Sequence, residues 1–189
     1  MRPKTLGLLL LGIFLAYQAV RSTLLLLALP TLSWPVALLG AIALNLFATG
    51  AFAFPGFVLP TRRLLPENYY RIKRPKQLRA FYNRLGVAHF RQFLLATFWQ
   101  SRTKQKSFFN GTRAGLRHFV NESRQAEFGH LGAGVVLLFV GVLLMIYDQI
   151  LTAFFTTVIN IVFNGYPVVL QRFHRVRIER IVERINPQL

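Results

Sequence analysis

Residues 131–170 read LGAGVVLLFVGVLLMIY, then DQ, then ILTAFFTTVINIVFNGYPVVL. Both apolar runs lie in a part of the chain, 125–171, that contains no Lys or Arg. A transmembrane helix needs about 20 mainly apolar residues. The stretch therefore predicts a transmembrane hairpin, with spans at Leu131–Tyr147 and Ile150–Leu170 and a polar turn at Asp148-Gln149.

A second apolar hairpin is predicted near the N-terminus, with spans at Leu6–Leu29 and Trp34–Phe54. The linker Pro30-Thr31-Leu32-Ser33 separates these spans. Ser33 or Thr31 is expected to cap the second helix, because hydroxyl side chains accept hydrogen bonds from the free N–H groups of a first turn.

Two features of the first span allow other interpretations. Arg21 falls inside it, and is expected to reach toward an interface or to pair with a polar group. Ala16-Tyr17-Gln18-Ala19 loosely resembles the cleavage site of a signal peptide. The apolar run resumes directly at Leu24, however, which favours a retained span over a cleaved one.

The composition fits a membrane protein of unusual charge. The 189 residues are 53% hydrophobic and 15% charged, and 23 Lys and Arg against 6 Asp and Glu give a net charge of +17. Disordered and nucleic-acid-binding basic chains are usually poor in large apolar residues, whereas this chain has 18 Phe, so we expect no nucleic-acid partner. The absence of Cys excludes a disulfide framework, a thiolate nucleophile and Cys-ligated zinc.

The cations other than Arg21 lie at the N-terminus, between 62 and 124, and between 172 and 184. Short Lys- and Arg-rich segments that flank membrane spans stay in the cytoplasm. Four spans place all three basic parts on one side of the membrane. The charge pattern therefore predicts a multi-pass protein with both termini in the cytoplasm.

The expected fold class is an all-α integral membrane protein, with about four transmembrane helices in two hairpins and a basic amphipathic cytoplasmic segment between them. Four parts are expected: an N-terminal hairpin at 1–56, the basic segment at 57–129, a C-terminal hairpin at 130–171 and a basic tail at 172–189. Within the basic segment, the spacing of apolar residues predicts a helix from Leu78 and an amphipathic helix at His89–Trp99. Its cations suit anionic membrane lipids or a phosphorylated ligand.

Glu127 and His130 are the first candidate for chemistry. Residues three apart share a face of a helix, and a carboxylate beside an imidazole can make it a better base. The same pair could equally be a plain hydrogen-bonded pair at the membrane boundary. A di-metal centre is excluded because it needs two Glu-x-x-His motifs and further glutamates. No third ligand for a lone zinc sits at a diagnostic spacing, so no metal is expected.

The last span contains Asn160 and Asn164, four residues apart on one face, and Gln171 continues that face. Amides inside a bilayer must be paired, so they serve either helix packing or a polar ligand site. Gly165-Tyr166-Pro167 is expected to kink the helix and free backbone groups there. The topology predicts a site at the cytoplasmic headgroup level, made of Glu127, His130, Asn164, Gln171, Arg172 and Arg175, with Glu122 one and a half turns before Glu127.

Two stretches also resemble a known family. They are Glu122-Ser123-Arg124-Gln125-Ala126-Glu127-Phe128-Gly129-His130 and, after a transmembrane hairpin, Asn164 followed by Gln171-Arg172-Phe173-His174-Arg175-Val176-Arg177. Their order and spacing resemble the glycosyl-4,4'-diaponeurosporenoate acyltransferase family. Thr61-Arg62, Pro66-Glu67-Asn68-Tyr69-Tyr70 and Phe81-Tyr82-Asn83-Arg84 are similar to the same family, over about 60–180 in all.

The resemblance implies a membrane acyltransferase of the bacterial cell membrane. It would esterify a hydroxyl of a lipid-soluble acceptor, a carotenoid glycoside or related glycolipid, with an acyl group from acyl-CoA or acyl-carrier protein, and would hold no bound cofactor. His130 would act as the base and Glu127 would orient it.

In the same interpretation, Asn164 or Gln171 would polarise the thioester, and Arg172 and Arg175 would bind the phosphates of the donor. A non-enzymatic accessory or assembly subunit of a membrane protein complex is the alternative, and a methyltransferase of the isoprenylcysteine type is disfavoured because no motif for its cofactor is found.

Overall fold

The computed structural model describes residues 3–97 and 113–185. This described part of the chain is helical and contains no strand. Four of its helices are long and apolar enough to cross a membrane. These stretches are Pro3–Ala28, Trp34–Gly56, His118–Ile146 and Ile150–Ile178. The all-α prediction with four candidate membrane spans is confirmed.

The helices follow one another along the chain with short connections. They are α1 (Pro3–Ala28), α2 (Trp34–Gly56), the 3₁₀ turn η1 (Thr61–Arg63), α3 (Glu67–Tyr70), α4 (Pro75–Arg84), α5 (Val87–Thr97), α7 (Arg113–Ile146), α8 (Ile150–Asn160), the π-helical turn η2 (Ile161–Gly165) and α9 (Tyr166–Ile185). The expected helix at His89–Trp99 corresponds to α5, and its last residues lie outside the described part of the chain. Ser33 precedes α2 in an extended conformation as its N-cap, without a side-chain hydrogen bond.

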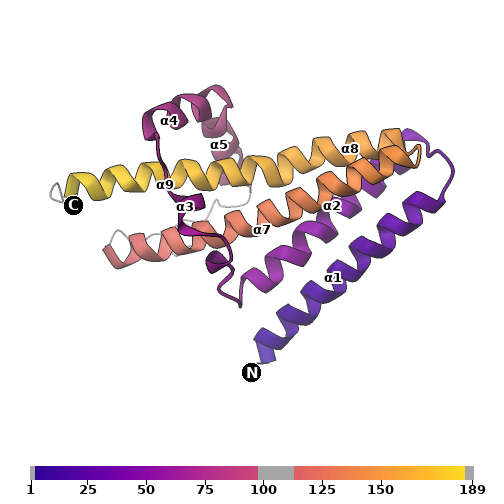
Figure 1. Ribbon diagram of the computed structural model, residues 1–189, viewed down its shortest axis with the longest axis horizontal. Coiled ribbons are helices and arrows are strands. Elements are labelled where there is room, and N and C mark those ends of the chain that lie inside the picture. The colour runs from indigo at the N-terminus through magenta and orange to yellow at the C-terminus, as the bar shows by residue number, and fades with distance from the viewer. Residues whose placement is uncertain (1–2, 98–112, 186–189) are drawn as a thin grey trace. The chain divides into compact units, whose positions relative to one another are not determined.

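The chain divides into two compact units, and each is described by itself. The first unit comprises Met1–Thr61 and Phe128–Pro167. In it α1 packs on α2, α2 packs on α8, and the last part of α7 runs beside them (Figure 1). Its core is formed by apolar side chains from all four helices: Leu26, Leu44, Ala48, Leu137, Leu144 and Ala153. Most of α1, including Arg21, is exposed, as a helix that faces lipid would be.

Glycines allow close helix contacts in the first unit. A Cβ atom added to Gly12 of α1 would lie 2.7 Å from the ring of Pro55 in α2, and one added to Gly132 of α7 would lie 2.4 Å from the ring of Phe52. Small residues at such positions let helix backbones approach, which is how helices pack within membranes.

The two hairpin turns of the first unit lie together at one end. Gln149 in the α7–α8 turn donates from Nε2 to the carbonyl oxygens of Leu29, at 2.8 Å, and Pro30, at 3.2 Å, in the α1–α2 turn. The backbone of Asp148 reverses the chain with a φ of 59°, a conformation that Asp tolerates better than most residues. Since each helix crosses the unit once, the chain enters and leaves it at the opposite end.

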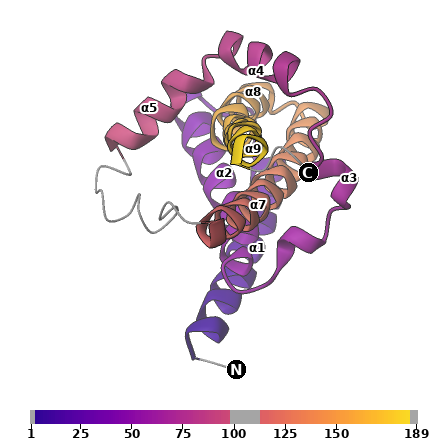
Figure 2. The ribbon, with the colours of Figure 1, turned by 90° about the vertical axis from the view of Figure 1, so that its left-hand side faces the viewer.

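The second unit comprises Arg62–Glu127 and Val168–Leu189. Within it α3, α4 and α5 follow one another around α9 and the first part of α7 (Figure 2). Its core is formed by Tyr82, Val87, Leu170 and Val176. Gly86, with a φ of 67°, makes the turn between α4 and α5, where glycine ends a helix without steric strain.

A π-helical turn, η2, leads into Gly165-Tyr166-Pro167, where the sequence predicts a kink. The N–H of Tyr166 bonds to the carbonyl of Ile161, five residues back. Proline has no N–H, so Pro167 cannot make the usual helical bond to the carbonyl of Phe163. Such wide turns are frequent at functional sites, and here the helix continues beyond the turn through α9.

Candidate functional site

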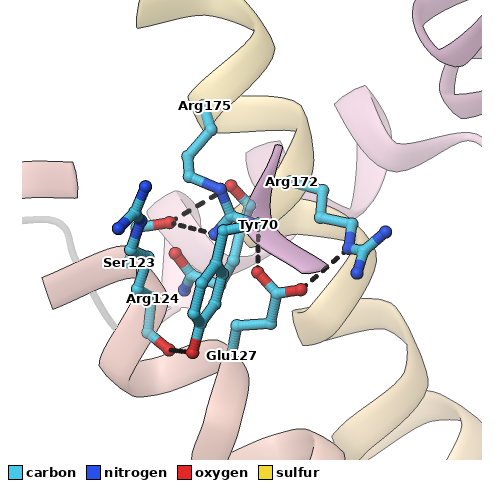
Figure 3. Close-up of polar contacts among 7 residues, drawn as sticks. Tyr70, Ser123, Arg124, Glu127, Arg172 and Arg175 are labelled. Atoms are coloured by element: carbon cyan, nitrogen blue, oxygen red, sulfur yellow. Dashed lines mark hydrogen bonds and ion pairs between the residues drawn. The ribbon is translucent and has the colours of Figure 1, made fainter. Parts of the chain in front are cut away.

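Glu127 is the centre of the polar cluster in the second unit. Its carboxylate is fully buried and is bound by two arginines of α9. Arg172 Nε lies 2.7 Å from Glu127 Oε1, and Arg175 Nη2 is bonded to Glu127 Oε2. Figure 3 shows the two guanidinium groups reaching the carboxylate from two sides. Both oxygens of the buried charge are therefore held by cations, as burial requires.

Two tyrosines of α3 pack against these arginines. The guanidinium carbon of Arg172 lies 4.5 Å from the ring centre of Tyr69, and that of Arg175 lies 5.4 Å from the ring centre of Tyr70. These are cation–π distances. The cluster is thus layered, with a carboxylate, two guanidinium groups and two aromatic rings.

A third arginine joins the cluster from α7. Arg124 lies 4.9 Å from the ring centre of Tyr70 and accepts a 3.4 Å hydrogen bond from the Tyr70 hydroxyl through its backbone carbonyl. Its Nη1 is 2.7 Å from Glu67 Oε1, an ion pair whose carboxylate is exposed. Ser123 accepts a 3.2 Å hydrogen bond from Arg175 Nη1 (Figure 3).

The environment of Tyr70 predicts that its hydroxyl ionises at a higher pH than that of an ordinary tyrosine. Burial, followed by the nearby negative charge of Glu127, raises the pKa of Tyr70 from 10.0 to about 12. In the unfolded protein the Tyr70 hydroxyl would release its proton near pH 10. Burial of the neutral hydroxyl therefore contributes to folding stability that is fully present below pH 10 and is lost as the pH rises through about 12. In an absorbance titration of the phenolate, the step that Tyr70→Phe removes is expected near pH 12.

The control for this titration is the same pair of proteins in strong denaturant, where the difference is expected near pH 10. A difference that appears near pH 10 in the folded protein as well would contradict the buried position of Tyr70.

The first unit holds a separate chain of polar side chains, the His130 chain, formed by His130, Asn164, Asn160, Thr49 and the backbone of Gly134. His130 Nδ1 lies 3.1 Å from Asn164 Oδ1, and Thr49 Oγ1 donates to the same oxygen at 3.1 Å. Asn164 Nδ2 donates to Asn160 Oδ1 at 3.0 Å, and Asn160 Nδ2 donates to the carbonyl of Gly134 at 3.0 Å. Each amide therefore both donates and accepts a hydrogen bond within the unit.

The structure gives Glu127 and His130 different partners from those expected. Both lie on α7, three residues apart, but Glu127 is bound by arginines and the ring of His130 is bound by Asn164. The side chain bonded to the ring is therefore Asn164. One N–H of the Asn164 amide nitrogen is bonded to Asn160 Oδ1, at 3.0 Å, and its role in polarising a thioester stays a prediction.

The two remaining predicted residues, Gln171 and Glu122, make no side-chain contact with Glu127 among those described above. Gln171 contributes its backbone carbonyl, which accepts a 3.2 Å hydrogen bond from Ser123 Oγ. Glu122 is half-buried on α7 and, within the described chain, takes no part in the contacts of the Glu127 cluster. Among the described residues no three His, Asp or Glu side chains gather closely enough to hold a metal ion.

Several residues of these two clusters were not predicted as site residues. Ser123 stands four residues before Glu127, a spacing that places both on one face of a helix and could have revealed it. For Asn160 the sequence predicts either a packing or a ligand role. No signal in the sequence points to Thr49, because its partner lies more than a hundred residues away.

Comparison with known proteins decides the family. A family model described as glycosyl-4,4'-diaponeurosporenoate acyltransferase matches residues 66–184, well over half of the chain. The chain belongs to this acyltransferase family. Searches among curated proteins and among solved structures find no match. Membership of this family indicates that the protein is an acyltransferase that acts in the modification of carotenoid glycosides.

The acyltransferase match contains every residue of the predicted site, since Glu122 and Arg175 both fall within it. The N-terminal hairpin, α1 and α2, lies before the matched residues. Thr49 on α2, which donates a hydrogen bond to Asn164, therefore lies outside the residues that match the family model.

Proposed function

We propose that the protein transfers a fatty acyl group from a thioester donor, acyl-CoA or acyl-carrier protein, to a hydroxyl of a carotenoid glycoside or related glycolipid. The observation that carries the proposal is an imidazole held at Nδ1 by a buried amide, within a chain of the acyltransferase family. A positioned histidine is the commonest general base.

In this reaction His130 takes the proton of the acceptor hydroxyl. The hydroxyl oxygen forms a bond to the thioester carbonyl carbon, the carbon–sulfur bond breaks, and the thiolate leaves with the proton that the imidazole carried. Direct transfer is preferred to an acyl-enzyme because the chain has no Cys and no Ser stands in the His130 chain.

The donor's phosphates are assigned to Arg172. Its Nε is engaged with Glu127, while its side chain keeps 31% of its exposure, compared with 4% for Arg175. Guanidinium groups bind phosphate in a forked geometry, and a partly exposed one can do so without losing its carboxylate partner. Arg175 is assigned to holding Glu127, and Asn164 or Gln171 is the candidate to polarise the thioester carbonyl.

We place the reaction at the cytoplasmic face of the bacterial cell membrane. Both hairpin turns, which carry no Lys or Arg, lie at one end of the first unit, so the basic segments leave from the other end. Basic segments stay in the cytoplasm. Exposed Phe81 and Phe93 on α4 and α5, among many cations, support contact of these helices with anionic lipid headgroups.

The test is lipid extraction and mass spectrometry of bacteria that make a glycosylated carotenoid, with and without the gene. The expected result is a new species heavier than the glycoside by one fatty acyl ester. An unchanged glycoside, with the protein present in the membrane, would contradict acyl transfer to this acceptor. Loss of an associated membrane complex on deletion, without any lost ester, would support an accessory subunit instead.

A further inference from the structure

The hydrogen bonds through Asn160 and Asn164 run in one direction. A backbone carbonyl can only accept, so the atom of Asn160 that lies 3.0 Å from the Gly134 carbonyl must be its amide nitrogen. The oxygen of Asn160 is then left to accept from Asn164 Nδ2, at 3.0 Å. Asn164 in turn presents its oxygen to Nδ1 of His130, at 3.1 Å.

We infer that the His130 chain of hydrogen bonds fixes a proton on Nδ1 of His130, so that proton exchange takes place at Nε2. Asn160 is then a positioning residue that acts through Asn164. An amide oxygen opposite a ring nitrogen must meet an N–H, because two acceptors cannot bond to each other. Nε2 is then the nitrogen that takes up and releases a proton. Only the use of this proton in catalysis rests on the proposed function.

The surroundings favour the same state of the ring. Thr49 donates to Asn164 Oδ1, which stabilises the orientation in which the oxygen faces His130.

Burial makes the chain a firm constraint. Asn160 is 4% exposed and Asn164 is 1% exposed, so water does not compete for their amide groups. Residues four apart share a face of a helix, which places Asn164 beside Asn160 so that their side chains bond directly. If Asn160 is lost, the amide of Asn164 is free to turn, and its nitrogen can face Nδ1 instead.

The experiment is ¹⁵N NMR of histidine-labelled full-length protein in lipid vesicles, at a pH where the ring is neutral. The signal of His130 is assigned with His130→Gln. The wild type is expected to show a protonated Nδ1, and Asn160→Leu is expected to lose this signal in favour of protonated Nε2. Asn45→Leu is the matched control, since Asn45 is equally buried in the same unit but bonds to the carbonyls of Ala41 and Thr156.

In the acyl-transfer assay, Asn160→Leu is expected to lower kcat roughly tenfold, the value of about one hydrogen bond, with the KM for the thioester unchanged. A wild-type protein with protonated Nε2, or an Asn160→Leu protein that keeps the Nδ1 proton, would overturn the inference. Full activity of a His130 variant would instead overturn the proposed function and leave the NMR result as it stands.

Discussion

Replacement of His130 by alanine is expected to lower the rate of acyl transfer about 10²–10⁴-fold, the usual contribution of a general base. The ring lies 3.1 Å from Asn164 at Nδ1. In the proposed reaction its Nε2 accepts the hydroxyl proton, and alanine removes that group. The measurement is the initial rate in membranes with a thioester donor and a glycosylated carotenoid, normalised to the amount of protein.

His118→Ala is the matched control for this substitution. It makes the same chemical change on the same helix, but at an exposed position away from the His130 chain. The control is expected to keep the wild-type rate. A His130→Ala protein that transfers acyl groups as fast as His118→Ala would remove His130 from the mechanism.

The sequence predicts the membrane helices well because the bilayer selects them by composition. Any helix that crosses it needs a long apolar run, and the four such runs in this chain are visible without knowledge of their neighbours. The same logic fails for the position of the helix ends. α7 begins at Arg113, well before the apolar run at Leu131, since a helix continues into polar residues when packing supports it.

The partners of the candidate residues could not be predicted in the same way. Spacing along one helix pointed from Glu127 to His130, which is a local relation. The side chains that bind Glu127 come from α9, and those that complete its cluster come from α3, 45 or more residues away in the sequence. Such contacts depend on how helices pack, and no periodicity in the chain encodes them.

The role of the tyrosines illustrates this limit. Tyr69 and Tyr70 stand among cations just after a predicted span, and this composition is typical of the lipid headgroup region. In the structure Tyr70 is 2% exposed, and the guanidinium groups of Arg124 and Arg175 both lie at cation–π distance from its ring. The tyrosines do contact cations, as their surroundings in the sequence indicate, but the arginines that they contact belong to α7 and α9.

Replacement of Glu127 by glutamine is expected to destabilise the second unit by roughly 3–5 kcal/mol, the usual effect of removing one partner from a buried ion pair. Glutamine keeps the shape of the side chain and removes its charge. Arg175, itself 3% exposed, and Arg172 would then share the site as two positive charges without a counter-charge. Thermal unfolding in detergent, followed by the helical circular dichroism signal, measures the loss.

Glu67→Gln separates the effect of burial from that of losing an ion pair. Glu67 is also bonded to an arginine of the second unit, at 2.7 Å, but 79% of its side chain is exposed. Exposed pairs contribute about 0–1 kcal/mol, so this variant is expected to unfold close to the wild-type temperature.

Charge compensation gives a second, opposite expectation. If Glu127→Gln is harmful because it leaves cations unbalanced, then Arg175→Met, which removes one of them from the same cluster, should cost less in the Glu127→Gln background than in the wild type. A double-mutant cycle without such coupling would mean that the shape of the cluster, and not its charge, holds α9 to α7 within the second unit. The negative charge of Glu127 would then not be required for stability, and a direct role in binding substrate would be left to explain why this buried residue is charged.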